Sequence, residues 1–83
     1  MRITVIDQQR GNARHYDIGS GANVGALSVA VARDNGHGSN AGAFMLTTMN
    51  GSPLSAHSKV GEACRDGGIY TLAQRRPATA LAG

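Results

Sequence analysis

Hydrophobic and polar residues alternate at the start of the chain. The apolar residues Met1, Ile3 and Val5 fall on one side of an extended segment, which predicts a strand with one buried face over residues 1–7. A second alternating segment covers residues 14–18 and follows a short turn that contains a Gly-Asn pair. Glycine and asparagine both tolerate the backbone angles of tight turns. Two strands around such a turn predict a β-hairpin.

The spacing of apolar residues changes after the hairpin from every second to every third or fourth position. Val24, Leu27 and Val31 recur with the period of one helix face, and Ala30 is expected on the same face. A Ser or Asn just before Val24 can cap the start of this helix. The Asn-Gly pair at residues 35–36 ends it.

Local patterns in the second half predict shorter elements. These are a loop over residues 36–42, a strand over 43–48, a helical turn followed by loop within 55–64, and a last strand over 69–74 with Tyr70 and Leu72 facing inward. The order is therefore strand, strand, helix, strand, short element, strand. Such an order suits one mixed sheet packed on a single helix.

Length and composition exclude several classes of protein. The chain has 83 residues and therefore holds one small domain. At about 100–200 residues per domain, there is no room for two independent cores. No apolar run approaches the roughly 18 residues that span a bilayer, so we expect no membrane segment. A single cysteine, Cys64, predicts a reducing, cytoplasmic setting. Eight Lys and Arg against five Asp and Glu are too few and too scattered to predict nucleic-acid binding.

The residues that could carry chemistry lack the spacing of a site. His15, His37 and His57 show no pairing with Cys64 that would predict a zinc site or a nucleophile with its base. The glycine-rich segment 19–25 lies between a hairpin and a helix, where it predicts a turn and cap rather than a phosphate-binding loop. We therefore predict no catalytic residue and no metal ligand. We expect the acidic residues only to cap turns or face solvent: Asp7, Asp17, Asp34, Glu62 and Asp66.

Five segments together carry a resemblance to a known family. They occur in one shared order at nearly constant spacing, over residues 1–5, 17–36, 44–46, 50–55 and 66–72. Their order and spacing resemble the β-grasp fold and, more narrowly, ubiquitin and its bacterial relatives. The resemblance implies an α+β fold, with a mixed four- to five-stranded sheet packed on one helix. It places this domain at residues 1–76 and a flexible C-terminal tail at 77–83.

The same resemblance implies a function as a bacterial protein modifier. Gly83 would be adenylated by a ThiF-type activating enzyme, which uses ATP, and passed as a thioester to a conjugating enzyme and then to target proteins. A deconjugating peptidase would reverse the bond. Leu81, Ala82, Arg75 and Arg76 would be the contacts that these enzymes recognise. The chain itself would be a monomer without a cofactor.

A recognition patch on the sheet is also implied by the resemblance. Ubiquitin builds this patch from a Leu, an Ile and a Val. The corresponding positions in this chain are Met45, Ala73 and either Gln9 or Arg10, which make a less apolar patch.

The C-terminal sequence departs from the family pattern and leaves two alternatives open. Ala82 precedes Gly83 where the family has Gly-Gly. The first alternative is a sulfur carrier that forms a thiocarboxylate at the same glycine. The second is an interaction module that is never conjugated, similar to the small ubiquitin-like partners of type VII secretion.

Overall fold

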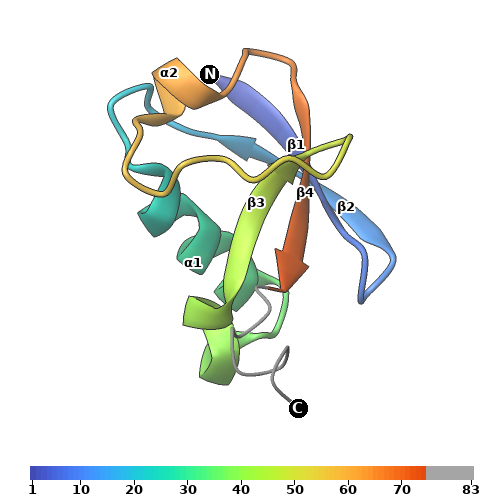
Figure 1. Ribbon diagram of the computed structural model, residues 1–83. Coiled ribbons are helices and arrows are strands. Elements are labelled where there is room, and N and C mark those ends of the chain that lie inside the picture. The colour runs from blue at the N-terminus through green and yellow to red at the C-terminus, as the bar shows by residue number, and fades with distance from the viewer. Residues whose placement is uncertain (75–83) are drawn as a thin grey trace.

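The computed structural model describes residues 1–74 and shows a four-stranded sheet with one main helix on it (Figure 1). The elements are β1 (Arg2–Asp7), β2 (Asn12–Asp17), α1 (Val24–Asp34), the 3-10 helix η1 (Gly38–Ala43), β3 (Phe44–Thr48), α2 (Val60–Ala63) and β4 (Ile69–Gln74). The strand order is β2-β1-β4-β3, with β1 and β4 parallel and the other neighbours antiparallel. This is the mixed sheet on one helix that the sequence predicts.

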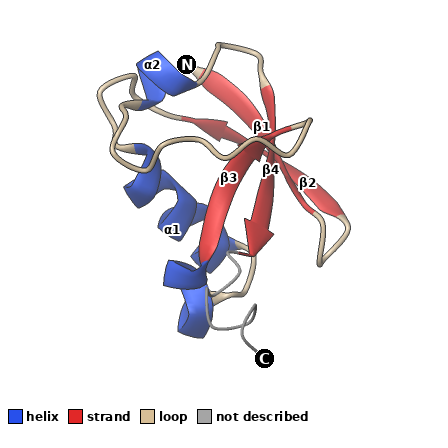
Figure 2. Cartoon of the chain, in the orientation of Figure 1, coloured by secondary structure: helices blue, strands red, loops and turns tan. Residues whose placement is uncertain are grey.

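Alternation along the strands decides which side chains enter the core. Ile3 and Val5 of β1 are buried, and so are the predicted inward residues Tyr70 and Leu72 of β4. In β3, Leu46 lies directly opposite Leu72 and is also buried. These side chains face α1, which covers the inner face of the sheet, as Figure 2 shows.

Helix α1 begins and ends as its sequence predicts. Asn23 is the N-cap, and its side-chain oxygen accepts a hydrogen bond from the amide of Ala26 at 3.2 Å. Gly36 follows the helix with a φ of 86°, a conformation that glycine adopts without a steric cost. The amide of His37 then donates to the carbonyl of Ala32 at 2.9 Å, which closes the last turn and directs the chain back toward the sheet.

The buried face of α1 is wider than predicted and is rotated slightly about the helix axis relative to the prediction. Val24, Leu27 and Val31 are buried, as expected, whereas Ala30 is exposed. Ser28 and Ala32 are buried in addition. The prediction for Ala30 is therefore wrong, because at 3.6 residues per turn the buried arc extends from Leu27 through Val24 toward Ala32 and leaves Ala30 outside.

Two loop predictions also need correction. The segment expected as a loop over 36–42 contains η1, which buries Ala41 against the core. The segment 55–64 has its helical turn at the end, not at the beginning. Val60 explains this position, because its side chain is fully buried and its amide donates to the carbonyl of Ala22 at 2.7 Å.

No helix within residues 1–74 is long and apolar enough to cross a membrane. The predicted domain boundary after residue 76, the predicted tail and its recognition residues Arg75, Arg76, Leu81, Ala82 and Gly83 lie outside the described residues.

Candidate interaction surface

The face of the sheet opposite α1 is the main candidate for a functional surface, and we call it the outer face. Every second residue of the strands points to it, since successive side chains of a strand alternate between faces. Met45 of β3 lies directly opposite Ala73 of β4, and both side chains are half-buried. The part of this face around β4 is formed by Ile6, Met45, Thr47, Ile69, Thr71 and Ala73, together with Met49 from the loop after β3. Thr4 of β1 and His15 of β2 continue the same face beyond Ile69.

The loop after β3 shapes this face. Gly51 has a φ of 88°, and its amide donates to the carbonyl of Thr48 at 2.9 Å, which makes a tight turn. The chain then returns along β3 and forms a bridge between Thr47 and Pro53. This turn brings Met49 to β4, where its sulfur accepts a hydrogen bond from the hydroxyl of Thr71 at 3.8 Å.

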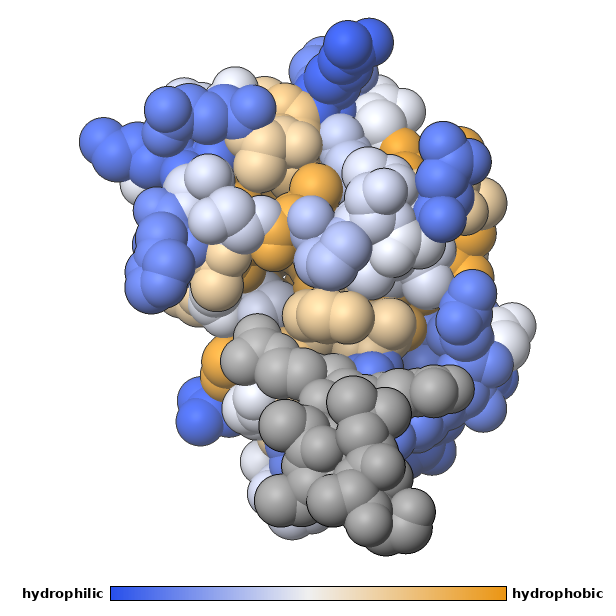
Figure 3. Space-filling view, in the orientation of Figure 1, coloured by the Kyte–Doolittle hydropathy of each residue, from blue (hydrophilic) through white to orange (hydrophobic). Residues whose placement is uncertain are grey.

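Threonines occupy the middle of the outer face, with large apolar side chains around them. Thr47 and Thr71 lie opposite each other and are only 3% and 5% exposed. Met49 and Ile69, in contrast, are 60% and 49% exposed. Exposed apolar residues that gather on one sheet face are typical of protein–protein contacts. Figure 3 views the molecule in the orientation of Figure 1, with β3 toward the viewer and not the outer face; hydrophobic and neutral residues occupy the middle of this side, and hydrophilic residues lie mostly toward its periphery.

Two of the three predicted patch positions come together. Met45 and Ala73 are cross-strand neighbours. Arg10 instead turns toward the helix side, where its guanidinium donates to the carbonyl of Gly36 at 3.4 Å. Gln9 is the residue of that turn that reaches β4, because its side-chain amide donates to the side-chain oxygen of Gln74 at 2.9 Å. Of the two residues considered for this position, the geometry therefore favours Gln9.

Sequence reasoning missed most of the outer face. The predicted patch did not include Ile6, Ile69, Thr71 and Met49. Alternation along β1 and β4 could have identified Ile6, Ile69 and Thr71. Once Tyr70 and Leu72 are expected to face inward, alternation places residues 69, 71 and 73 on the opposite side. Met49 could not be found in this way, because its position depends on how the loop after β3 folds back.

At the edge of the sheet, a polar network joins β2 to the end of α1. One oxygen of Asp34 accepts hydrogen bonds from the hydroxyl of Tyr16 at 2.9 Å and from the guanidinium of Arg14 at 3.2 Å. The side-chain amide of Asn35 donates to Tyr16 at 3.3 Å and to the carbonyl of Val31 at 2.8 Å. Burial, followed by the hydrogen bond to Asp34 and the charge of that carboxylate, raises the pKa of Tyr16 to about 12.

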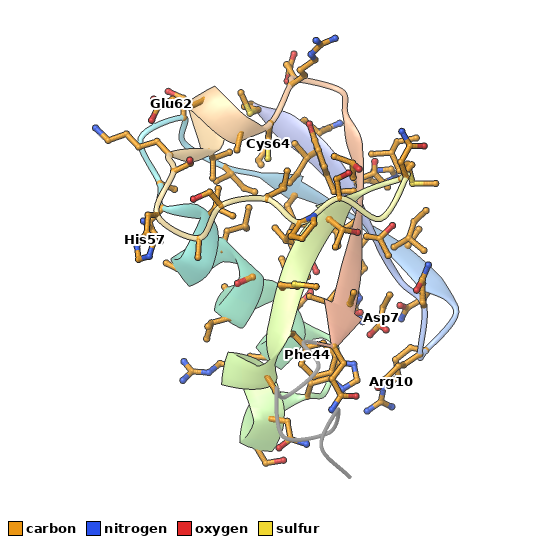
Figure 4. All side chains as sticks on the ribbon, in the orientation of Figure 1. Asp7, Arg10, Phe44, His57, Glu62 and Cys64 are labelled. Atoms are coloured by element: carbon orange, nitrogen blue, oxygen red, sulfur yellow. The ribbon has the colours of Figure 1, made fainter. Side chains whose placement is uncertain are left out.

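A buried carboxylate stands at the end of β1. Asp7 caps the β1–β2 turn, as expected of the acidic residues, but it is only 1% exposed and so does not face solvent. One oxygen accepts the amides of Gln9 and Arg10 at 2.9 and 3.2 Å, and the other lies 2.8 Å from Nε2 of His37. Figure 4 shows Asp7 and Phe44 at the same end of the sheet. The sequence signal is weak, because 30 residues separate Asp7 from His37.

The cysteine and the other two histidines lie apart from one another and form no common site. Cys64 is buried, and burial raises the pKa of its thiol, with a hydrogen bond from Tyr70 acting in the opposite direction. A nucleophilic cysteine needs the opposite shift, because the thiolate is the reactive form. His57 lies on a separate loop (Figure 4), and His15 is exposed and bonded to Thr4 at 2.8 Å. Among residues 1–74 there is no pocket and no cluster of three His, Cys, Asp or Glu suited to a metal ion.

Comparison with solved structures identifies the fold. The chain is similar to the solution structure of the N-terminal ubiquitin-like domain of the 4931431F19Rik protein, with a TM-score of 0.71 at 16% sequence identity, over 94% of this chain and 77% of that one. Matches extend to 115 solved chains, so the assignment does not depend on a single structure. No protein-family model and no curated protein matches the sequence. The chain therefore has the β-grasp fold of ubiquitin-like domains.

Proposed function

We propose that this chain is a ubiquitin-like protein modifier of a bacterial pathway and works in the cytoplasm as a substrate of other enzymes rather than as a catalyst. The observation that carries the proposal is the outer face. In this fold, it presents Met45 and Ala73 beside the exposed side chains of Met49 and Ile69. Exposed apolar side chains on a sheet face, with no pocket among residues 1–74, suit recognition by another protein better than binding of a small molecule.

The proposed reaction takes place at Gly83. Its carboxylate attacks the α-phosphate of ATP on a ThiF-type activating enzyme, and pyrophosphate leaves. A cysteine thiolate of the enzyme then displaces AMP to form a thioester, which passes to a conjugating enzyme. An amine of the target finally attacks the thioester and releases the thiol, and a deconjugating peptidase hydrolyses the product. Glycine suits this position because the absence of a side chain leaves the carbonyl carbon open to each attack.

Each part of the chain has a separate role in this scheme. The outer face is the surface that the activating and conjugating enzymes hold, and Arg75, Arg76, Leu81 and Ala82 are the contacts that lead Gly83 into their active sites. ATP belongs to the activating enzyme, and the chain carries no cofactor of its own. The folded unit acts as a monomer. Its target proteins follow from the conjugating enzyme, not from this chain.

The test compares three epitope-tagged proteins in the native host by denaturing gel and intact mass. These are the wild-type chain, a chain that lacks Gly83 and the outer-face variant Met45→Glu. A fourth protein, His57→Asn, is the surface control, and all four carry the tag at the N-terminus so that Gly83 stays free. We expect a ladder of heavier species that is lost without Gly83, reduced by Met45→Glu and unchanged in the control. A ladder that persists without Gly83 would contradict the proposal. A mass change of one sulfur for one oxygen would identify a sulfur carrier instead.

A second candidate is an interaction module that is not conjugated. One observation favours it: the most exposed apolar residue of β4, Ile69, lies at the start of that strand, whereas the C-terminal segment leaves from its other end after Gln74. A partner centred on Ile69 and Met49 would not need the tail. In this case, Ile69→Glu would abolish co-purification of the partner, deletion of Gly83 would leave it intact, and no ladder would form.

A further inference from the structure

Five residues from five separate segments are linked in a ring at the end of the sheet from which the chain continues beyond β4; three links join side chains, one is the pairing of Phe44 with Gln74 in the sheet, and one is the backbone amide of Gln9 bonded to Asp7. We call it the exit ring. It consists of Asp7 at the end of β1, Gln9 in the β1–β2 turn, His37 after α1, Phe44 at the start of β3 and Gln74 at the end of β4. Neither the outer face nor the proposed chemistry accounts for this arrangement.

The buried half of the ring is the pair formed by Asp7 and His37. The side chains of Asp7 and His37 are only 1% and 10% exposed, and their nearest oxygen and nitrogen atoms are 2.8 Å apart. A buried carboxylate is stable only when its oxygens are hydrogen-bonded, and Asp7 also accepts the amides of Gln9 and Arg10. The pair therefore holds the β1–β2 turn in one position relative to the end of α1.

The ring of His37 is held from its other side by Phe44. The two aromatic rings stack with centroids 4.3 Å apart and an angle of 26° between their planes. Phe44 is buried and lies directly opposite Gln74 in the register of β3 and β4. The position of His37 is thus coupled through Phe44 to the last residue of β4.

The exposed half of the ring is the contact between Gln9 and Gln74. The side-chain amide of Gln9 donates to the side-chain oxygen of Gln74 at 2.9 Å. Gln74 is consequently tied on one side to β3 and on the other to the turn that Asp7 holds. Ala73, the residue before it, belongs to the outer face. The ring therefore lies next to the outer face at the C-terminal end of β4.

We infer that His37 is a positioning residue, which fixes Gln74 through the exit ring and so sets the direction in which the chain leaves β4 relative to the outer face. The inference about direction stands on the ring alone. Its consequence for conjugation rests on the proposed function, because an enzyme that holds the outer face needs the following segment to start in a constant direction.

Three substitutions separate the contacts of the ring. His37→Phe keeps an aromatic ring against Phe44 and removes the hydrogen bond to Asp7. His37→Gln loses the stacking and retains a nitrogen donor for Asp7. Gln9→Ala breaks only the exposed link to Gln74 and leaves the buried pair intact, so it remains informative if His37→Phe does not fold. The matched control is His15→Asn, at an exposed histidine that also makes one hydrogen bond.

The first measurement is solution NMR of the whole chain. Residual dipolar couplings report the orientation of the amides of Gln74 and Arg75 relative to the sheet. We expect these couplings to depart from the wild-type values in His37→Phe and Gln9→Ala and to remain unchanged in His15→Asn. In His37→Gln they should return only part of the way, because this variant keeps the link through Asp7 and loses the one through Phe44. His37→Phe removes one hydrogen-bond partner of Asp7, which should loosen the turn that Asp7 holds. We therefore also expect the amide of Arg10 to exchange with solvent about ten-fold faster.

Two results would overturn the inference. If His37→Phe speeds exchange at Arg10 but leaves the couplings of Gln74 and Arg75 unchanged, the pair is only a local anchor of the turn. If exchange speeds up equally across the whole sheet with no change in these couplings, the role of His37 is general stability.

The conjugation ladder then tests the consequence. Where the wild-type chain forms a ladder, we expect His37→Phe to reduce it about ten-fold and His37→Gln to restore part of it. If no ladder forms with the wild-type chain, the proposed function fails while the NMR result on direction stands. A full ladder from a His37→Phe chain with altered couplings would show that direction does not limit conjugation.

Discussion

The two faces of the sheet differ sharply, although they share the same strands. On the inner face, Leu46 and Leu72 are each 1% exposed and pack against α1. On the outer face, their neighbours in sequence, Met45 and Ala73, are half-buried, and Ile69 is 49% exposed. One residue along a strand is therefore enough to move a side chain from the core to an open surface.

This difference separates the source of stability from the proposed recognition surface. Helix α1 covers only the inner face, and the buried apolar core that drives folding lies there. The other face contributes little burial apart from Thr47 and Thr71. Its residues are consequently available for a partner, and substitutions there should alter binding more than folding.

The largest expected effect is on the inner face. We expect Leu72→Ala to lower the free energy of unfolding by about 2–5 kcal/mol, because it removes a fully buried side chain and leaves a cavity. In a domain of this size, that loss is a large part of the total stability. Urea denaturation followed by circular dichroism measures it. A loss below about 1 kcal/mol would mean that the inner face is not the main source of stability.

An intermediate effect is expected at the edge of the inner face, where Tyr16 bonds to Asp34. The pKa of Tyr16 is raised from 10.0 to about 12 in the folded state, so the unfolded chain loses this proton first as the pH rises. Stability from this group is therefore complete below pH 10 and falls between pH 10 and about 12. Since Tyr16 is partly exposed, we expect the loss to be on the order of 1 kcal/mol.

The matched variant for this measurement is Tyr16→Phe. It lacks the titrating hydroxyl but keeps the ring, so subtraction of its urea denaturation curves removes the contribution of all other groups that titrate in this range. The difference in unfolding free energy between the two proteins should shrink above pH 10. A difference that stays constant to pH 12 would contradict the raised pKa.

The smallest effect on stability is expected on the outer face. Ile69→Thr keeps a β-branched residue suited to a strand and removes much of an exposed apolar side chain, so we expect a change within about 0.5 kcal/mol. Under the proposed function, the same change should weaken binding to the partner enzyme. Parallel urea denaturation and co-purification assays measure the two effects. A loss of stability similar to that of Leu72→Ala would show that the outer face is part of the folding core.

The fold was predictable because most of its elements are local. Alternation of single residues predicts β1 and β4, and the spacing of Val24, Leu27 and Val31 predicts α1 together with its Asn23 cap. The predictions failed where local signals were weak. The helical turn at Val60 depends on burial against Ala22 rather than on its own sequence.

The candidate surface was only partly predictable. The resemblance named Met45 and Ala73, and the structure places them opposite each other in β3 and β4; their role in recognition stays a prediction. The sequence could not decide whether Gln9 or Arg10 lies beside β4, because both residues belong to one short turn. The backbone of that turn determines which of them reaches Gln74. Met49 was missed for a similar reason.

The sequence by itself determined the strands, the helix and the turns, since periodicity, capping residues and glycines act within a few positions of one another. Only the tertiary structure decided which distant residues meet. Asp7 and His37 form a buried pair across 30 residues, and Gln9 reaches Gln74 across 65. Such contacts depend on the order of strands in the sheet and on the angle at which α1 returns to it. Neither leaves a signal in the local sequence, because each is set by the packing of the whole domain.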